Sequence, residues 1–250
     1  MNRFTGRFPI HSYAVDAFGT LALPALAGYL QEIAGRHAIA LGCGMDALRA
    51  RGLTWVLSRQ RIDAHAPVRL GEEVTIATWP SGVERLFVHR EFTVRRDGAE
   101  VARASTAWLV LDLDKRRPVR PDEVLDPALR PRLEAVAPIP PRLPEPGGGA
   151  PGRRFDVRYA ELDVNRHVNN ATYVAWALEG ASPERWASSR ACAVEAHYVA
   201  EARQGDAVVA RTEELGAELL HAVVRDRDAK ELARLRTRWV ARAISPPSSA

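Results

Sequence analysis

The segment Ala102-Arg-Ala-Ser-Thr106-Ala-Trp108 returns in the second half of the chain as Ala233-Arg-Leu-Arg-Thr237-Arg-Trp239. Both copies keep the pattern Ala-Arg-x-x-Thr-x-Trp inside a predicted strand. Two other pairs of short matches keep the same order along the chain: Arg69–Val74 with Arg203–Val208, and Tyr13–Asp16 with Tyr159–Asp163. Because the separation between partners is nearly constant, the sequence predicts two copies of one structural unit.

Each half contains the same succession of predicted elements, namely a strand, a helix and about four strands. In the first half the helix begins near Thr20 or Pro24 and ends near Gly42, a short helix covers residues 45–51, and a lead-in precedes Tyr13. The strands are expected at residues 54–62, 73–79, 86–95 and 101–113, with a break at 80–82 and a hairpin turn at 97–98. In the second half a helix runs from 169–170 to Gly180, and strands are expected at 155–159, 193–199, 207–213, 219–225 and 232–241.

A sheet that wraps one central helix is the hot-dog architecture, and the sequence predicts it twice. The expected fold is α+β, a double hot-dog of two tandem repeats, each with a long central helix wrapped by an antiparallel sheet. The predicted boundaries are 1–116 for the N-terminal repeat, 117–153 for a Pro/Gly-rich linker of mixed stiffness, and 154–244 for the C-terminal repeat. A short helix fits at 123–136 within the linker, and residues 245–250 are predicted to be a disordered tail.

Composition describes an ordinary globular protein. The 250 residues are 46% hydrophobic and 26% charged, which suffices for two domains with cores of their own. The net charge of +4 favours an acidic partner, but no nucleic-acid-binding motif is present. Two cysteines, no signal peptide and no membrane-length apolar run lead us to expect a cytoplasmic protein. Abundant Arg and Ala are typical of a GC-rich bacterial genome.

The stretch from Asp163 to Trp176 carries the strongest functional signal. Asp163, Asn165 and His167 stand at i, i+2 and i+4, a spacing that turns all three side chains to one side of an extended loop. Two asparagines follow, which are good helix caps, and a helix N-terminus favours developing negative charge. Taken singly, Asp163 is explained as a helix cap and His167 as a hydrogen-bonded core histidine. As a set they predict an active site.

Only the second repeat carries this triplet. The first repeat has Asp16-Ala-Phe-Gly-Thr at the corresponding place, without His or Asn. We therefore expect the second repeat to be catalytic. The apolar helix of the first repeat, with Trp55, Trp79 and Phe87, fits the walls of a pocket for an apolar ligand, although each of these aromatic residues taken singly is better explained as part of the core.

The motif Asp163-Val-Asn165-Arg-His167-Val-Asn-Asn-x-x-Tyr173-x-x-Trp176 resembles the signature of the acyl-acyl carrier protein thioesterases of plants and bacteria. The resemblance extends over nearly the whole chain, including Gln31-Glu32 on the first helix. It implies a double hot-dog fold and hydrolysis of fatty acyl chains from acyl carrier protein. It further implies catalytic roles for Asp163, Asn165 and His167.

The family also carries an acid on the next strand, in the segment Tyr-x-x-Glu-Cys. Here the segment is Tyr198-Val-Ala-Glu201-Ala202, so Glu201 matches the acid and Ala202 replaces the cysteine found in many plant members. Cys43 and Cys192 are far from the motif, and there is no Gly-x-Ser-x-Gly sequence. Direct attack by water is therefore the simplest mechanism.

We assign hypothetical roles on this basis. His167 or Glu201 takes the proton from water, and Asp163 holds a partner in place or shares in taking that proton. Asn165 positions the water or the thioester carbonyl. Backbone amides from Val168 through Asn169 to Asn170 are expected to stabilise the oxyanion. No metal or redox cofactor is expected, and phosphopantetheine belongs to the substrate carrier.

Three other functions fit parts of the pattern. An acyl-coenzyme A thioesterase would use the same site, and Arg153, Arg154 and Arg166 are candidates for a basic rim that prefers the acidic carrier protein. A hot-dog hydratase or dehydratase would show Asp-x-Asn-Pro-x-His, which is one residue longer. A non-catalytic acyl-binding protein has no need for the triplet. A homodimer of such chains is plausible.

Overall fold

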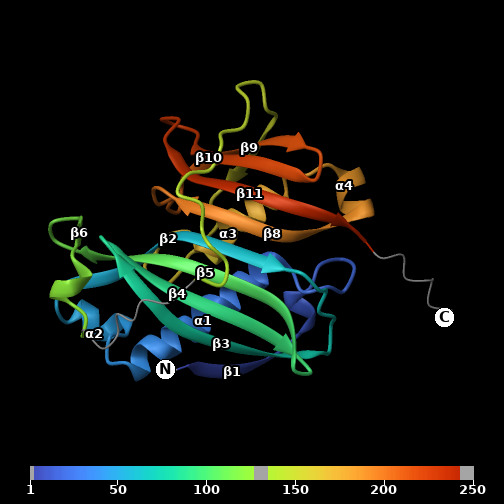
Figure 1. Cartoon of the computed structure of the whole chain (residues 1–250). Helices are drawn as coiled ribbons and strands as arrows, with labels where there is room; N and C mark the ends of the chain where they lie inside the picture. The colour runs from blue at the N-terminus through green and yellow to red at the C-terminus, as the bar shows by residue number, and fades with distance from the viewer. Residues whose placement is uncertain (1–2, 127–134, 243–250) are drawn as a thin grey trace.

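Strands from both halves of the chain join in one antiparallel sheet in the computed structural model, which describes residues 3–126 and 135–242 (Figure 1). The strand order is β1-β3-β4-β5-β2-β8-β11-β10-β9-β7, with β6 paired to β5. This order reads as the same five-strand arrangement in opposite directions from the β2–β8 junction. It confirms the predicted double hot-dog.

The first repeat contains these helices and strands: β1 (Phe4–Pro9), α1 (Leu23–Ala40), α2 (Met45–Arg49), β2 (Leu53–Ala64), β3 (Glu73–Glu84), β4 (Phe87–Arg96), β5 (Ala99–Asp112) and β6 (Arg117–Val119). The second contains β7 (Gly152–Asp156), α3 (Asn170–Leu178), α4 (Pro183–Ser188), β8 (Ser189–Tyr198), β9 (Ala207–Leu215), β10 (Glu218–Arg225) and β11 (Glu231–Ala241). Short 3-10 turns occur at Ser12–Ala14, Pro121–Glu123 and Tyr159–Glu161.

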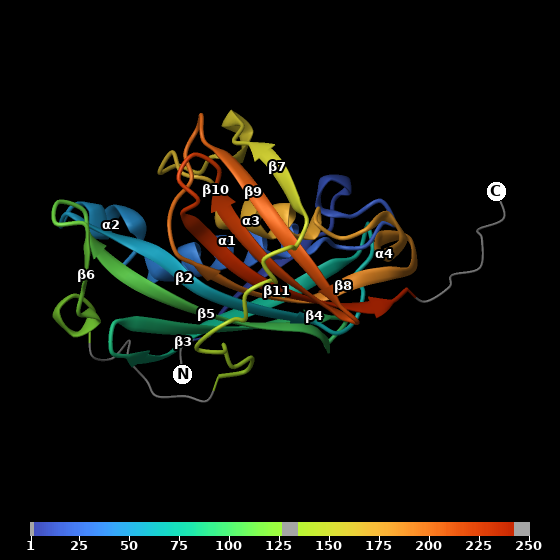
Figure 2. The ribbon, with the colours of Figure 1, turned by 90° about the horizontal axis from the view of Figure 1, so that it is seen from above.

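The two central helices lie side by side inside the curve of the sheet, as Figure 2 shows. Leu30 and Ile33 of α1 and Val174 and Ala177 of α3 are almost completely buried, and they belong to one hydrophobic cluster that spans both repeats. Full burial of a large aliphatic side chain contributes about 1.5–3 kcal/mol. The repeats therefore share a core, and each depends on the other for part of its stability.

The predicted break in the third strand is wrong. β3 continues through Pro80 to Glu84, with a shift in its pairing to β4 between Pro80 and Gly82. β1 pairs with β3 only as far as Thr78, so the missing N–H of Pro80 costs no hydrogen bond on the β1 side. The hairpin at Asp97-Gly98 is confirmed, since both residues have positive φ (51° and 80°) as a tight turn requires.

The expectation of a long central helix holds for α1, with 18 residues, and fails for α3, with nine. A Cβ on Gly180 would lie 2.0 Å from Oγ1 of Thr212, so the chain passes too close to β9 there for any larger residue. Ser182 then caps a separate helix, α4, which has Pro183 in its first turn. α4 was not predicted from the sequence, whereas β1 is the strand that was expected, without bounds, before the first helix.

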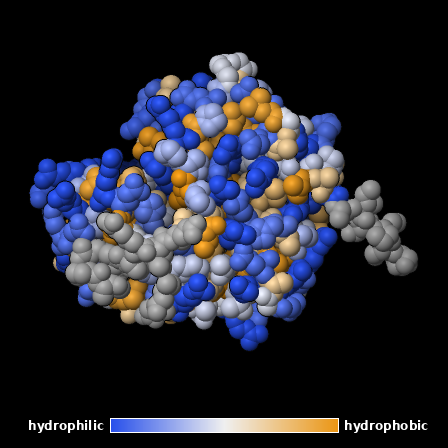
Figure 3. Space-filling model, viewed as in Figure 1, coloured by the Kyte–Doolittle hydropathy of each residue, from blue (hydrophilic) through white to orange (hydrophobic). Residues whose placement is uncertain are grey.

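Residues 135–151, which lead into the second repeat, cross the outer face of the sheet, on the side opposite the helices (Figures 1 and 2). The backbone N–H of Val136 donates to the buried carboxylate of Glu91 at 3.0 Å. Farther along, Pro138 and Pro140 accept hydrogen bonds from Arg61 and His197, which lie on β2 and β8. The linker is thus fastened to both repeats where they meet. The face it crosses is mostly hydrophilic, with hydrophobic residues in small separate groups (Figure 3).

Two sequence predictions fall partly or wholly outside the described residues. The helix at 123–136 overlaps residues 127–134, and of its remainder Glu123 ends a 3-10 turn. The disordered tail at 245–250 lies within residues 243–250, which are outside the description.

A buried histidine should make stability depend on pH. His221 on β10 is 0% exposed, and burial lowers its pKa to about 3. Its ring nitrogens contact the hydroxyl groups of Thr212 and Thr237 at 3.0 and 2.9 Å. As pH falls below about 6.5, the unfolded chain binds a proton at this residue and the folded chain does not, so folding becomes less favourable.

We expect His221 alone to lower the free energy of unfolding by about 3 kcal/mol between pH 7 and pH 4. Urea unfolding of the wild type and of His221→Gln, followed across this range, measures the difference. The variant should lose less stability on acidification than the wild type. An identical acid slope in both proteins would contradict the assignment.

Candidate active site

The motif Asp163–His167 forms a tight turn, and the expected extended loop is wrong. The carboxylate oxygen Oδ1 of Asp163 accepts hydrogen bonds from the backbone N–H groups of Asn165 (2.8 Å) and His167 (3.2 Å). The N–H of Asp163 donates to the carbonyl of His167 at 2.8 Å, and Arg166 has a φ of 61°. Asp163 therefore holds the shape of the turn, as an aspartate does when it binds the backbone two residues on.

The first repeat contains the same turn without the reactive side chains. Oδ1 of Asp16 accepts from the N–H groups of Phe18 (3.0 Å) and Thr20 (2.9 Å), and Gly19 has a φ of 71°. The N–H of Asp16 donates to the carbonyl of Thr20 at 2.8 Å. The turn is thus a property of the repeat. What distinguishes the second copy is Asn165 in place of Phe18 and His167 in place of Thr20.

His167 and Glu201 come together at this turn. Nε2 of His167 lies 3.3 Å from Oε2 of Glu201, and the two side chains are 26% and 39% exposed. The N–H of Val168 donates to the carbonyl of Ala202, which fixes the Glu201 loop against the turn. The sequence prediction that these residues face one another agrees with this geometry. Asp163 is directed at the backbone and at Asn165.

Tyr173 of α3 also anchors the Glu201 loop. Its hydroxyl accepts a hydrogen bond from the N–H of Ala202 at 2.9 Å, and burial raises the pKa of Tyr173 to about 12. The hydroxyl of Tyr198 donates to the side chain of Gln60 at 3.2 Å. Because burial also raises the pKa of Tyr198, both tyrosines stay protonated at neutral pH and act as hydrogen-bonding groups.

Arginines from the first repeat reach this site, although no pattern in the sequence predicted them. Nη2 of Arg49 lies 2.5 Å from Oδ1 of Asn165, whose Nδ2 donates to Oδ2 of Asp163 at 3.2 Å. Arg116 lies 3.9 Å from Glu201 and Arg203, from the second repeat, lies 3.6 Å from it. The negative charge of Glu201 is therefore flanked by two guanidinium groups as well as the imidazole.

The beginning of α3 supplies fewer free amides than expected. The N–H of Val168 is used by Ala202, and the N–H of Asn169 donates to the carbonyl of Glu161 at 2.9 Å. The side chain of Asn169 accepts from the N–H of Ala171, which confirms it as the helix cap. The structure thus contradicts an oxyanion role for the Val168 and Asn169 amides. The Asn170 amide makes no hydrogen bond with the residues that are described.

A large cavity opens at the turn, with a volume of about 1590 Å³. Asn165, His167 and Glu201 line its mouth, and it extends along one side of α1 where Gly28 and Gly35 stand in place of larger residues. Strands of the first repeat form the opposite wall, which includes Trp55 and Trp108. A Cβ added at either glycine would meet nothing within 4 Å, so both face open space.

Of the three aromatic residues predicted to line this pocket, only Trp55 does so. Trp79 is buried beneath the guanidinium of Arg3, which lies 4.2 Å from its ring, and Phe87 is covered by Arg59 at 4.8 Å. Both contacts are of the cation–π type. These two side chains belong to other parts of the first repeat.

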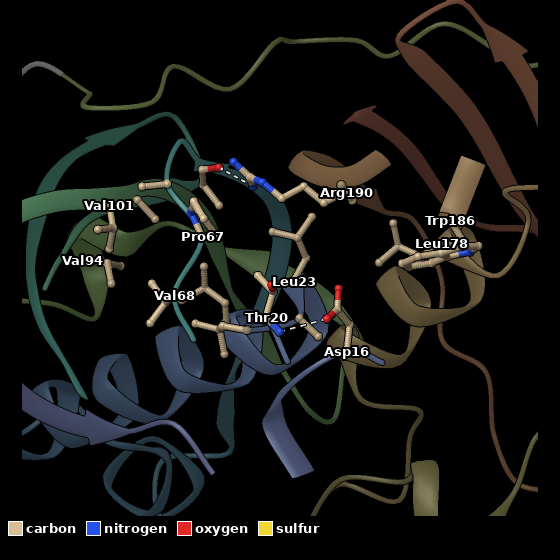
Figure 4. Close-up of a pocket in the computed structure, with 17 residues that line it drawn as sticks. Asp16, Thr20, Leu23, Pro67, Val68, Val94, Val101, Leu178, Trp186 and Arg190 are labelled. Carbon is tan, nitrogen blue, oxygen red and sulfur yellow. Dashed lines mark hydrogen bonds between the residues drawn. The ribbon is translucent and has the colours of Figure 1, made fainter. Parts of the chain in front are cut away.

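The counterpart of the site in the first repeat is nearly closed. A cavity of about 50 Å³ remains beside Asp16 and Thr20, covered by Trp186 and Arg190 from the second repeat (Figure 4). Arg242 pairs with Asp16 at 3.2 Å and lies 3.6 Å from the centre of the Phe18 ring. This space suits a few water molecules at most.

The basic residues at the mouth differ from those predicted. Arg153 pairs with Glu179, and Arg154 pairs with Asp156 and Asp226, all away from the cavity. Arg166 does line the cavity, together with Arg49, Arg116 and Arg203.

In the described part of the chain no group of His, Cys, Asp and Glu has the geometry of a metal site. No described helix is both long and apolar enough to cross a membrane.

Comparison with known proteins identifies relatives of both repeats. Residues 1–128 match the acyl-ACP thioesterase N-terminal domain, and residues 150–241 match the acyl-ACP thioesterase C-terminal domain. Oleoyl-acyl carrier protein thioesterase 2 of Arabidopsis thaliana, a chloroplastic protein, is 30% identical over 227 residues, which are 81% of this chain and 60% of that protein. The chloroplastic acyl-[acyl-carrier-protein] hydrolase FATB2 of Cuphea viscosissima is 26% identical over 258 residues. Those residues are 94% of this chain and 62% of the Cuphea protein, so the chain spans less than two thirds of these plant relatives.

Solved structures resemble the whole fold. An acyl-ACP thioesterase from Bacteroides thetaiotaomicron has a TM-score of 0.84 and 26% identity, covering 95% of this chain and 98% of that one. The 12:0-ACP thioesterase of Umbellularia californica has a TM-score of 0.85 and 25% identity, covering 96% and 98%. With both domain models matched in order along one chain, this protein belongs to the acyl-ACP thioesterase family.

Proposed function

We propose that this protein hydrolyses fatty acyl-acyl carrier protein to free fatty acid and carrier protein. The observation that carries the proposal is the 3.3 Å contact between His167 and Glu201 at the mouth of a long cavity. An imidazole beside a carboxylate is suited to taking a proton from water, and the cavity is suited to an acyl chain. The relatives are named for activity on the same class of substrate.

In the proposed reaction, water attacks the thioester carbonyl while His167 takes its proton. Glu201 orients the imidazole and stabilises the imidazolium that forms. The carbonyl oxygen becomes an oxyanion, which Asn165 and the free amide of Asn170 stabilise at the N-terminus of α3. When the tetrahedral intermediate collapses, the carbon–sulfur bond breaks and the imidazolium returns its proton to the leaving thiolate. Asp163 binds the backbone N–H groups of Asn165 and His167 and so holds the turn that presents their side chains.

The mechanism uses only groups of the protein and water, so no cofactor is part of the proposal. The phosphopantetheine arm belongs to the carrier. Arg116, Arg166 and Arg203 give the cavity entrance a positive charge that suits an acidic carrier protein. A bacterial origin, a cytoplasmic location and a homodimer remain predictions of the same proposal.

Acyl-coenzyme A is the second candidate substrate, because the same arginines suit its phosphate groups. Rates with acyl-carrier protein and acyl-coenzyme A of matched chain length separate the two. We expect a higher kcat/KM with the carrier protein. The reverse order would make this an acyl-coenzyme A thioesterase. A hydratase and a non-catalytic acyl-binding protein are less well supported, since the relatives are thioester hydrolases.

Replacing His167 tests the chemistry directly. His167→Ala should lower kcat/KM for acyl-carrier protein by at least about 100-fold, because the proton acceptor is lost. Free fatty acid released from purified substrate is the measurement. Thr20→Ala, at the corresponding position in the first repeat, is the matched control and should keep its activity. A wild-type kcat/KM in His167→Ala would contradict the mechanism.

The two aspartates of the repeated turn separate folding from catalysis. Asp163→Ala and Asp16→Ala each remove a carboxylate that accepts two backbone hydrogen bonds, so each should lower the free energy of unfolding by about 2 kcal/mol. Only Asp163→Ala should also lower fatty acid release by the folded enzyme. Urea unfolding and activity at low temperature provide the two measurements. Equal losses of activity would show that the turns do not differ in function.

A further inference from the structure

We propose that Arg49 is a positioning residue of the active site, which fixes the side-chain amide of Asn165 from the opposite repeat. The proposal rests on the thioesterase activity proposed above. It adds a functional residue in the repeat that lacks the Asp-Asn-His triplet, and it gives that repeat a part in the chemistry beyond enclosing the acyl chain.

Arg49 is placed for this contact by the fold. It is the last residue of α2, and its Nη2 lies 2.5 Å from Oδ1 of Asn165, 116 residues away in the sequence. None of the ion pairs found within residues 3–126 and 135–242 includes Arg49. The one hydrogen bond that its side chain makes in that set is the bond to Asn165. A guanidinium donates only, so it holds the oxygen end of the amide.

Asp163 holds the other end. Its carboxylate accepts from Nδ2 of Asn165 at 3.2 Å, and a carboxylate can only accept. The donor on one side and the acceptor on the other leave one possible orientation of the Asn165 amide. Nδ2 has two N–H groups, and one stays available for the substrate. Without Arg49, the amide would be held at one end only and would be free to turn about its terminal torsion.

The available N–H matters because backbone donors are few. The amides of Val168 and Asn169 are bonded to Ala202 and Glu161, which leaves Asn170 as the remaining backbone donor of that group. An oxyanion is stabilised best by donors that are already in place before it forms. A fixed Asn165 would provide the second donor.

The turn of the first repeat is also contacted by an arginine from the other repeat. There, Arg242 from the second repeat lies 3.6 Å from the centre of the Phe18 ring, and Phe18 occupies the position of Asn165. Each turn therefore receives an arginine from the other repeat. In the first repeat it covers a ring and pairs with Asp16, whereas in the second it contacts a reactive amide.

The test is a double-mutant cycle on kcat and KM, with purified acyl-carrier protein as substrate. Arg49→Ala should lower kcat by about 10- to 100-fold, the cost of losing one charged hydrogen bond, and change KM by less than about threefold. Arg49→Lys, which keeps a donor, should recover part of the rate, and Arg49→Met, which keeps the apolar stem, should not. In an Asn165→Ala background, Arg49→Ala should change kcat by less than about twofold.

Arg7→Ala is the control, because Arg7 is an exposed arginine of β1 that pairs with Glu73, and this variant should match the wild type. An unchanged kcat in Arg49→Ala would overturn the inference. So would a loss confined to KM, or a loss that adds to that of Asn165→Ala, since either would mean that Arg49 binds the substrate itself. A wild type that releases no fatty acid from any acyl thioester would overturn the proposed function, and this inference with it.

Discussion

The pairing of β2 with β8 is the contact on which the rest of the molecule depends. Residues 59–63 of β2 pair with residues 193–197 of β8, and this register joins two five-strand halves in one sheet. Charged side chains tie the junction together: Arg61 pairs with Asp63 and Glu195, and Glu195 also pairs with Arg236. Because each helix lies in the curve of its own half, the junction also fixes α1 beside α3. The shared core and the shared cavity follow from that placement.

Within this frame the active site is a small change to a repeated part. The turn closed by an aspartate occurs in both halves with the same backbone hydrogen bonds. Its capacity for chemistry comes from the two side chains that the turn presents and from the carboxylate across from them. In the first half the corresponding side chains are Phe18 and Thr20, and Arg242 seals the turn. The backbone of the turn is therefore the same in both repeats, and only the side chains that it presents differ.

Much of this could be predicted from the sequence, because it is local or repeated. The matching Ala-Arg-x-x-Thr-x-Trp segments gave the two units, and the spacing of polar residues from Asp163 to Asn170 indicated the site and its helix cap. Contacts between distant segments could not be predicted. Nothing near Arg49 or Arg116 in the sequence shows that they reach residues over 80 positions away. The close approach of Gly180 to Thr212, just past the end of α3, is also a tertiary fact.

The closed turn of the first repeat has a consequence for symmetry. In a dimer of identical hot-dog units, any side chain placed at the turn appears twice, so two sites must be built and both must stay open. Joining the units in one chain removes that restriction. One turn is free to carry Phe18 and Thr20 and to pair with Arg242, while the other carries Asn165 and His167. The two turns therefore share one backbone shape and differ in the side chains that they present.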